Sequence, residues 1–167
     1  LPDFAAFPLV HDPDELRRYY EPYVAFARDA GVGVILDTAT WRASSDWAQR
    51  LGYSPEALAD ANRRAVALVR GLGDDVVVCG AIGPRGDGYS ADERMTADEA
   101  QAYHSEQIGA LADADLVCGL TMTYSDEAIG VVRAAQAADM PVVISFTVET
   151  DGRLPSGETL ADAIERV

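Results

Sequence analysis

The sequence predicts an α/β fold built on a parallel β-sheet, and three observations lead to that prediction. Helical and strand-like segments alternate along all 167 residues. The strand-like segments are short and almost continuously apolar, as expected for strands that are buried on both faces. Apolar residues make up 49% of the chain, so a domain of this length can bury a real core. Alternating elements of this kind are typical of parallel sheets covered by helices.

Capping residues and helical spacing mark where the helices begin. Asp12 is followed by Pro13 and Glu15, which is a favourable helix start, and apolar residues then recur at helical spacing until Gly31. Thr96 and Glu99 form a capping box for a later helix. The six predicted caps, in chain order, are Asp12, Ser44, Ser54, Thr96, Ser125 and Thr159.

Four apolar runs predict the strands, at residues 31–37, 75–82, 115–122 and 141–148. One predicted helix, or two between the first and second runs, separates each run from the next, so consecutive strands are expected to be parallel. No dinucleotide-binding fingerprint or P-loop follows any of the four runs, which disfavours a nucleotide-binding fold. An open parallel sheet remains possible, and so does a (β/α)₈ barrel, of which four strands form roughly half.

In both architectures the functional residues gather at the carboxyl ends of the strands. The segments that follow the four runs are rich in hydroxyl, glycine and acidic residues, whereas the helix-to-strand connections are plainer. Turn formation alone would also account for Asp37, Thr40 and Gly83-Pro84. The candidate site residues are Asp37, Thr38, Thr40, Gly83, Pro84, Thr121, Thr123, Ser145, Thr147 and Glu149.

Composition excludes several classes of function. The net charge of −15 disfavours binding to nucleic acid or to anionic membranes, and no apolar run is long enough to span a membrane. All 13 basic residues are Arg, so no Lys can form a Schiff base. Cys79 and Cys118 lie inside apolar runs without a CxxC motif, and they are expected to be buried thiols. Two isolated cysteines and no signal peptide suggest a cytoplasmic protein.

Five segments, in this order and spacing, resemble the homocysteine S-methyltransferase family. They are DTATWRAS (37–44), CGAIGPRGDGY (79–89), YHSEQIGAL (103–111), TMTYSDEAIG (121–130) and SFTVETDGRLPSGETL (145–160). The resemblance covers almost the whole chain. It implies that residues 1–167 are a single partial (β/α)₈ TIM-barrel domain containing strands two to five, with the remaining strands before Leu1 and after Val167.

The resemblance also implies a reaction, a cofactor and partners. Family members transfer a methyl group to the sulfur of homocysteine in methionine biosynthesis, from donors such as S-methylmethionine, betaine or methyltetrahydrofolate. A zinc ion held by three cysteines binds the thiol and favours its thiolate form. The expected partners are therefore a small-molecule thiol and a methyl donor, with a homo-oligomer possible.

The same resemblance suggests roles for the candidate residues, although it identifies no catalytic group. Asp37, Thr38 and Thr40 would contact substrate, and Gly83 with Pro84 would shape the pocket floor. Thr121 and Thr123 would offer hydroxyls, while Ser145, Thr147 and Glu149 would line the edge of the fifth barrel strand.

Two departures from the family leave other functions open. The zinc cysteines belong to barrel strands six and eight, so no metal ligand is expected in this chain, and Cys79 and Cys118 do not match them. Many members also bind the amino group of homocysteine through a Glu, where this chain has Leu120. A related thiol acceptor is thus an alternative. So are a metal-dependent barrel enzyme of the lyase type, using Asp37 and Glu149, and a non-catalytic homologue that binds a small molecule.

Overall fold

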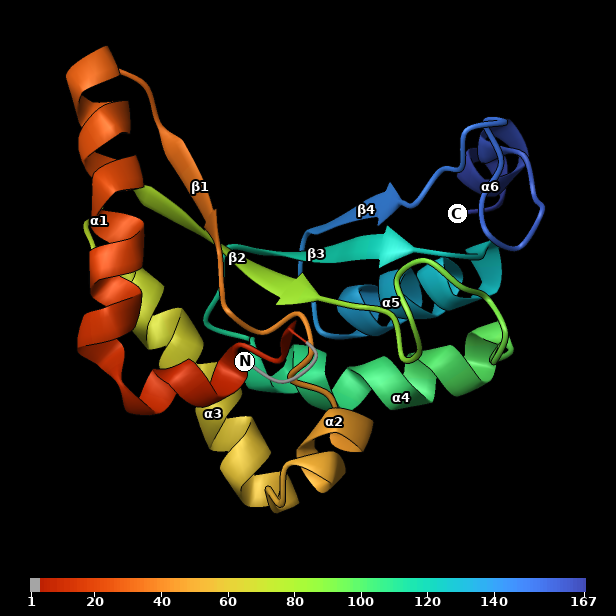
Figure 1. Ribbon diagram of the computed structural model, residues 1–167, viewed down its shortest axis with the longest axis horizontal. Coiled ribbons are helices and arrows are strands. Elements are labelled where there is room, and N and C mark those ends of the chain that lie inside the picture. The colour runs from red at the N-terminus through yellow and green to blue at the C-terminus, as the bar shows by residue number, and fades with distance from the viewer. Residues whose placement is uncertain (1–3) are drawn as a thin grey trace.

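A computed structural model describes residues 4–167 and shows helices alternating with strands (Figure 1). The elements follow one another as η2 (Phe7–His11), α1 (Pro13–Ala30), β1 (Val34–Asp37), α2 (Ser45–Arg50), α3 (Pro55–Arg70), β2 (Val76–Ile82), α4 (Ala97–Ala110), β3 (Leu116–Met122), α5 (Ser125–Ala137), β4 (Val142–Phe146) and α6 (Leu160–Arg166). This order confirms the predicted alternation. No helix among residues 4–167 is long and apolar enough to cross a membrane.

The four strands form one sheet in the order β1-β2-β3-β4, and all three pairings are parallel. The predicted parallel sheet is therefore confirmed. The strands are shorter than the apolar runs: β1 begins at Val34 rather than Gly31, and β4 ends at Phe146 rather than Val148. Because the strands are parallel, all four carboxyl ends lie along the same edge of the sheet.

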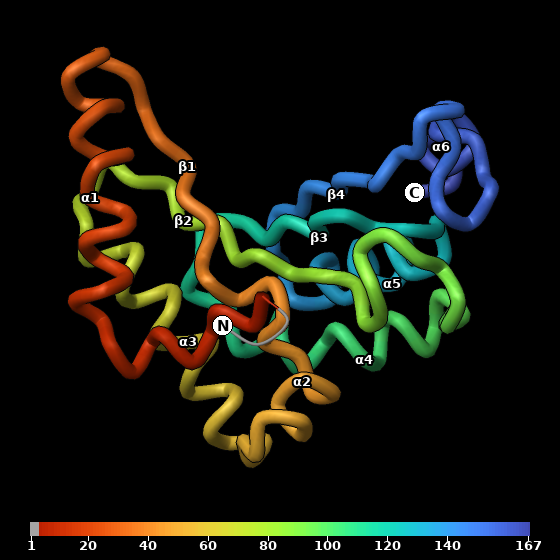
Figure 2. The backbone as a smooth tube through the Cα atoms, in the orientation of Figure 1, coloured from red at the N-terminus to blue at the C-terminus, as the bar shows by residue number. Residues whose placement is uncertain are grey.

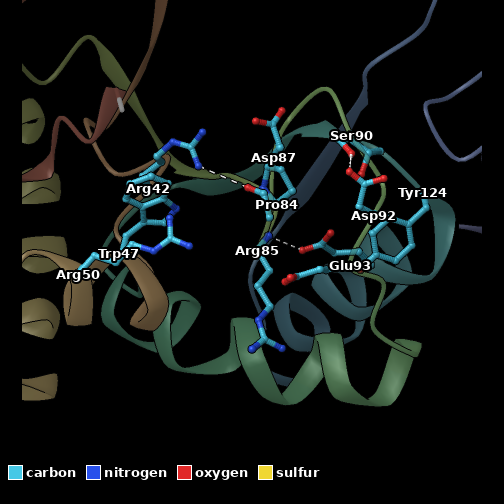
Figure 3. Close-up of a pocket in the computed structure, with 13 residues that line it drawn as sticks. Arg42, Trp47, Arg50, Pro84, Arg85, Asp87, Ser90, Asp92, Glu93 and Tyr124 are labelled. Atoms are coloured by element: carbon cyan, nitrogen blue, oxygen red, sulfur yellow. Dashed lines mark hydrogen bonds between the residues drawn. The ribbon is translucent and has the colours of Figure 1, made fainter. Parts of the chain in front are cut away.

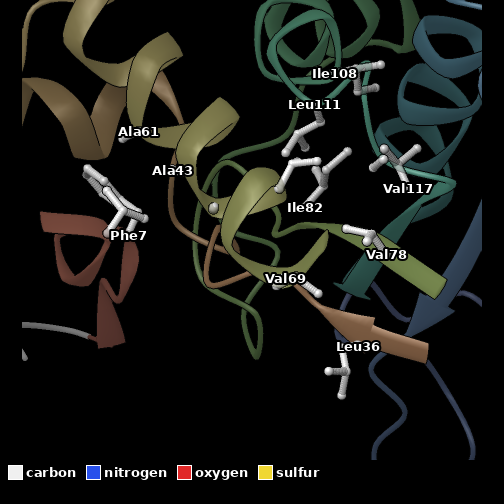
Figure 4. Close-up of a cluster of buried hydrophobic side chains, with 14 of the residues drawn as sticks. Phe7, Leu36, Ala43, Ala61, Val69, Val78, Ile82, Ile108, Leu111 and Val117 are labelled. Atoms are coloured by element: carbon white, nitrogen blue, oxygen red, sulfur yellow. The ribbon is translucent and has the colours of Figure 1, made fainter. Parts of the chain in front are cut away.

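The helices cover one face of the sheet. Figure 1 shows α3, α4 and α5 beneath the strands and α1 beside β1, and the tube in Figure 2 shows the same arrangement. Leu36, Val78 and Val117 are buried in the hydrophobic core, together with Phe7 from η2 (Figure 4). Gly130 brings α5 against α4 so closely that an added Cβ would lie 2.4 Å from the Cβ of Ala100.

The opposite face, called the inner face below, has no helix over it among residues 4–167 (Figure 1). Ile35, Val77 and Val143 point to this side, with exposed fractions of 62%, 39% and 49%. A sheet that buries one face under helices and carries apolar residues on the other is the arrangement found inside a (β/α)₈ barrel.

The predicted caps are largely confirmed. Asp12, Ser54, Thr96 and Thr159 each accept a hydrogen bond from the third residue of their helix. Ser44 occupies the cap position of α2, although its side chain accepts no capping bond. The prediction for Ser125 was wrong. Tyr124 is the cap of α5, and the Ser125 hydroxyl instead contacts Glu158 and Arg166, which ties α5 to α6.

Candidate functional site at the carboxyl ends of the strands

A closed set of hydrogen bonds joins the ends of β1 and β2. The Ala81 amide donates to Thr38 Oγ1 over 3.1 Å, and Thr40 Oγ1 donates to the Ala81 carbonyl over 2.7 Å. The two threonine hydroxyls lie 2.6 Å apart. Thr38 and Thr40 are only 3% and 0% exposed. Their hydroxyls therefore position the strand ends, and their predicted contact with substrate stays a prediction.

The end of β1 is fixed from the helical side as well. Tyr20 of α1 donates from its hydroxyl to the carbonyl of Asp37 over 2.8 Å. Burial, the neighbouring Tyr19 and the charge of Asp37 raise the pKa of Tyr20 to about 12, so its hydroxyl keeps its proton. Asp37 itself is exposed and points to the inner face, as its alternation with Leu36 requires.

Trp41, Gly83 and Thr121 pack closely together where β1, β2 and β3 end, and these three residues are called the wall below. The Gly83 amide donates to the carbonyl of Trp41 over 2.9 Å, and a Cβ on Gly83 would lie 2.4 Å from that same oxygen. The Trp41 indole donates to Thr121 Oγ1 over 3.2 Å. Thr121 has a positive φ of 57° at an irregularity in the β3–β4 pairing. Such bulges re-aim side chains, and this one turns Thr121 towards Trp41.

The β4 end lies at the other edge of the sheet from Asp37. Ser145 is exposed on the inner face, and Thr147 Oγ1 donates to the carbonyl of Gly88 over 2.6 Å. Glu149 is exposed in a turn, with its backbone paired to Arg153. Asp37 and Glu149 therefore follow the two strands at opposite edges of the sheet, β1 and β4.

Cys79 shares the inner face with Asp37, its register partner on β1. Contact with the Cys118 thiol, burial and the Asp37 carboxylate all raise the pKa of Cys79, so this thiol is protonated at neutral pH. Among the residues that the structure describes, no three His, Cys, Asp or Glu side chains could hold a metal ion. The donor set of residues 4–167 does not fit a zinc site.

Sequence reasoning missed a buried ionisable pair behind this wall. His104 Nε2 lies 3.0 Å from Glu127 Oε1, and both side chains are almost completely buried. The same carboxylate oxygen accepts the backbone amide of Arg85 over 2.7 Å, which anchors the loop after β2 to α5. The spacing of residues on α4 could have shown that His104 is buried, because His104 falls on the same helical face as Ala100 and Ile108.

A cavity of about 520 Å³, called the outer cleft below, opens beside the loop that follows β2. In Figure 3, Arg42, Trp47 and Arg50 lie on one side of it, and Ser90 and Asp92 lie on the other. Two predicted site residues, Pro84 and Thr123, line it. Asp37, Thr121 and Ser145 do not, so the predicted residues do not all line one cavity.

Comparison with known proteins agrees with the fold. The family model for homocysteine S-methyltransferase matches residues 3–167. The homocysteine methyltransferase MmuM from Escherichia coli is similar in its metallated form, with a TM-score of 0.83 and 23% identity over 99% of this chain. Its oxidized form gives the same TM-score and identity. No curated protein matches.

The chain spans 63% of the length of the metallated MmuM chain. A partial match of this extent to a homocysteine methyltransferase barrel confirms the predicted fold class, a (β/α)₈ TIM barrel of which this chain forms part. Because the family model extends along nearly all of the chain, the chain belongs to the homocysteine S-methyltransferase family.

Proposed function

We propose that the protein transfers a methyl group to the sulfur of a small thiol, with homocysteine or a related molecule as acceptor. The observation that carries this proposal is the family match along residues 3–167, which includes every strand end described above. In the reaction the bond between the methyl carbon and the donor breaks, a new sulfur–carbon bond forms, and the thiol proton is released. A cytoplasmic role in methionine biosynthesis would suit this chemistry.

The residues of this chain would bind and orient the acceptor. Asp37 presents a carboxylate to the inner face at the end of β1, and a carboxylate attracts the ammonium group of an amino-acid thiol. Leu120, on the inner face of β3, cannot supply that charge. Asp37 therefore takes the role of ammonium partner in our proposal, while Ser145 offers a hydroxyl across the same face.

The Trp41–Gly83–Thr121 wall would form the floor beneath the acceptor. Gly83 has no room for a side chain, because a Cβ would also lie 2.8 Å from the Trp41 indole nitrogen. Fixed neighbours of this kind hold a bound molecule in one orientation, which contributes to the rate of a transfer between two substrates. Zinc, which the family implies, would need ligands other than those in residues 4–167.

Asp37→Asn in the complete protein tests the proposal. We expect the KM for homocysteine to rise about tenfold or more, the factor that 1.4 kcal/mol represents, with S-methylmethionine as donor. Glu149→Gln should have a smaller effect, since its side chain lies beyond β4 in an exposed turn. Asp29→Asn is the matched control, because Asp29 is equally exposed but precedes β1 at the opposite end of the strand.

Three results would count against the proposal in different ways. Unchanged kinetics for Asp37→Asn would remove Asp37 from the acceptor site. Thiol binding without methyl transfer from any of the three donor types would favour the non-catalytic alternative. A tightly bound divalent cation with turnover that needs no thiol would favour a different barrel enzyme.

A further inference from the structure

The outer cleft carries charges of both signs that do not neutralise one another. Arg50 contributes a guanidinium from α2, and Asp92 and Glu93 contribute carboxylates from the loop after β2. Within residues 4–167 none of these three side chains forms a salt bridge. Figure 3 shows Arg50 and Asp92 on opposite sides of the cavity.

The basic side is rigidly built. The Arg42 guanidinium lies 4.4 Å from the Trp41 ring centre and 4.2 Å from that of Trp47, and Arg50 lies 4.7 Å from the Trp47 ring. Trp47 is only 7% exposed, so it is fixed in the core while one edge lines the cleft. Stacking on Trp47 holds the Arg50 guanidinium in place on this side of the cleft.

Hydrogen bonds fix polar side chains of the acidic side and the floor, as stacking fixes those of the basic side. Ser90 donates from its hydroxyl to Asp92 over 2.5 Å, which orients that carboxylate. Glu127, buried to 99%, lies at the floor and keeps one oxygen engaged with His104 and the Arg85 amide. The edge of Trp47 lies on the basic side, and the ring of Pro84 lies between the two sides beside Arg85 and Asp87 (Figure 3). The cleft thus has a cationic end and an anionic end, and the apolar surfaces of Trp47 and Pro84 lie on the way from one to the other, beside Asp87 and an Arg85 that pairs with Asp46.

We propose that the outer cleft is a binding site for a small aliphatic zwitterion, such as an amino acid whose two charges are separated by methylene groups. The carboxylate of the ligand would lie at Arg50, its ammonium group at Asp92 and Glu93, and its methylenes against Trp47 and Pro84. A cavity of about 520 Å³ is within the usual range for small-molecule sites. A ligand with one charge would leave the opposite side without a partner.

This site is separate from the proposed acceptor site, although one loop forms a wall of both. Gly88, in the loop that carries Asp92, accepts the Thr147 hydroxyl on the far side. A Cβ on Gly88 would lie 3.0 Å from Thr121 Oγ1 and 3.1 Å from the Trp41 ring. A zwitterion in the outer cleft would therefore hold this loop against the wall of the acceptor site.

Calorimetric titration of the complete protein tests the proposal with four probes of increasing charge separation: glycine, β-alanine, γ-aminobutyrate and 6-aminohexanoate. At least one should bind, and butyrate and butylamine should each bind about tenfold more weakly than the best zwitterion. Arg50→Gln and Glu93→Gln should each raise its Kd about tenfold, equivalent to 1.4 kcal/mol. Both side chains are exposed, so the variants should keep the melting temperature of the parent.

Matched controls separate this site from general charge effects. Arg63→Gln and Glu21→Gln make the same charge changes on exposed faces of α3 and α1, and they should leave the Kd unchanged. Asp37→Asn should also leave it unchanged. The proposal is wrong if no probe binds, if the single-charge compounds bind as well as the zwitterions, or if binding follows Asp37 rather than Arg50. None of these outcomes depends on methyl transfer.

Discussion

Removing the hydroxyl of Thr40 should loosen the junction between β1 and β2 without changing its shape. Thr40→Val keeps the volume of the side chain and deletes one oxygen. That oxygen donates to the Ala81 carbonyl over 2.7 Å and lies 2.6 Å from Thr38 Oγ1, in a site with no solvent exposure. A typical buried hydrogen bond contributes about 1–1.5 kcal/mol, so the loss of two should lower the free energy of unfolding by about 2–3 kcal/mol.

Urea unfolding of the complete protein, followed by circular dichroism, measures this difference as a shift of the midpoint at constant slope. Thr40→Ser is the control, because it keeps the hydroxyl and loses one methyl group, at a cost of about 0.8 kcal/mol. We also expect a higher KM for the acceptor in Thr40→Val, because Asp37 and Trp41 lie on either side of this junction. Equal destabilisation by Val and Ser would refute the reasoning, since it would show that the hydroxyl contributes nothing.

Two further predictions concern the helical layer. Gly130→Ala should destabilise the protein by about 1–3 kcal/mol, because the new methyl group would overlap Ala100. Gly109→Ala, on the open side of α4, should instead stabilise the protein by up to about 1 kcal/mol. Thermal unfolding of the two variants compares these effects, and equal changes in melting temperature would contradict the packing argument. Burial favours a higher pKa for Glu158, but hydrogen bonds from Ser125, Ser156 and Arg166 outweigh it and lower the pKa to about 2. A depressed folded-state pKa contributes stability above the unfolded value, near 4.5, which is lost as the pH falls towards 2. The melting temperature should therefore fall across that window and fall less in Glu158→Gln, and identical profiles would show that Glu158 contributes nothing.

The elements could be predicted from the sequence because their signals are local. Asp12 with Pro13, and Thr96 with Glu99, cap helices through atoms a few residues apart, and the structure places both as predicted. Ser125 illustrates the limit. A serine before an apolar helical stretch is a good cap by local rules, yet its hydroxyl binds Glu158 and Arg166, which are more than thirty residues away along the chain. The Ser125 hydroxyl could cap α5 or bind Glu158 and Arg166, and contacts between distant parts of the chain select the second.

The candidate site was predictable only to the level of the strand ends. Asp37 and Ser145 do lie on the inner face, because side-chain alternation along a strand is set by the backbone. Thr123 lines the outer cleft whereas Thr121, two residues earlier, does not, and the bulge at Thr121 lies between β3 and β4 just before this point. No sequence pattern marks that bulge. The outer cleft could not be predicted either, because Arg50 and Glu93 line it from separate segments whose sequence patterns are unrelated.

The order of the strands in space has a consequence for folding. Because β1, β2, β3 and β4 are neighbours in the order in which they are synthesised, each new strand can dock on its predecessor without waiting for later chain. Each step closes a loop that contains one helix or, between Val34 and Val76, two helices, and the entropic cost grows only slowly with loop length, so successive steps cost similar amounts. The chain can therefore grow by repeated addition of a helical segment and a strand while it leaves the ribosome, with β2 and β3 as the first pair to be flanked on both sides.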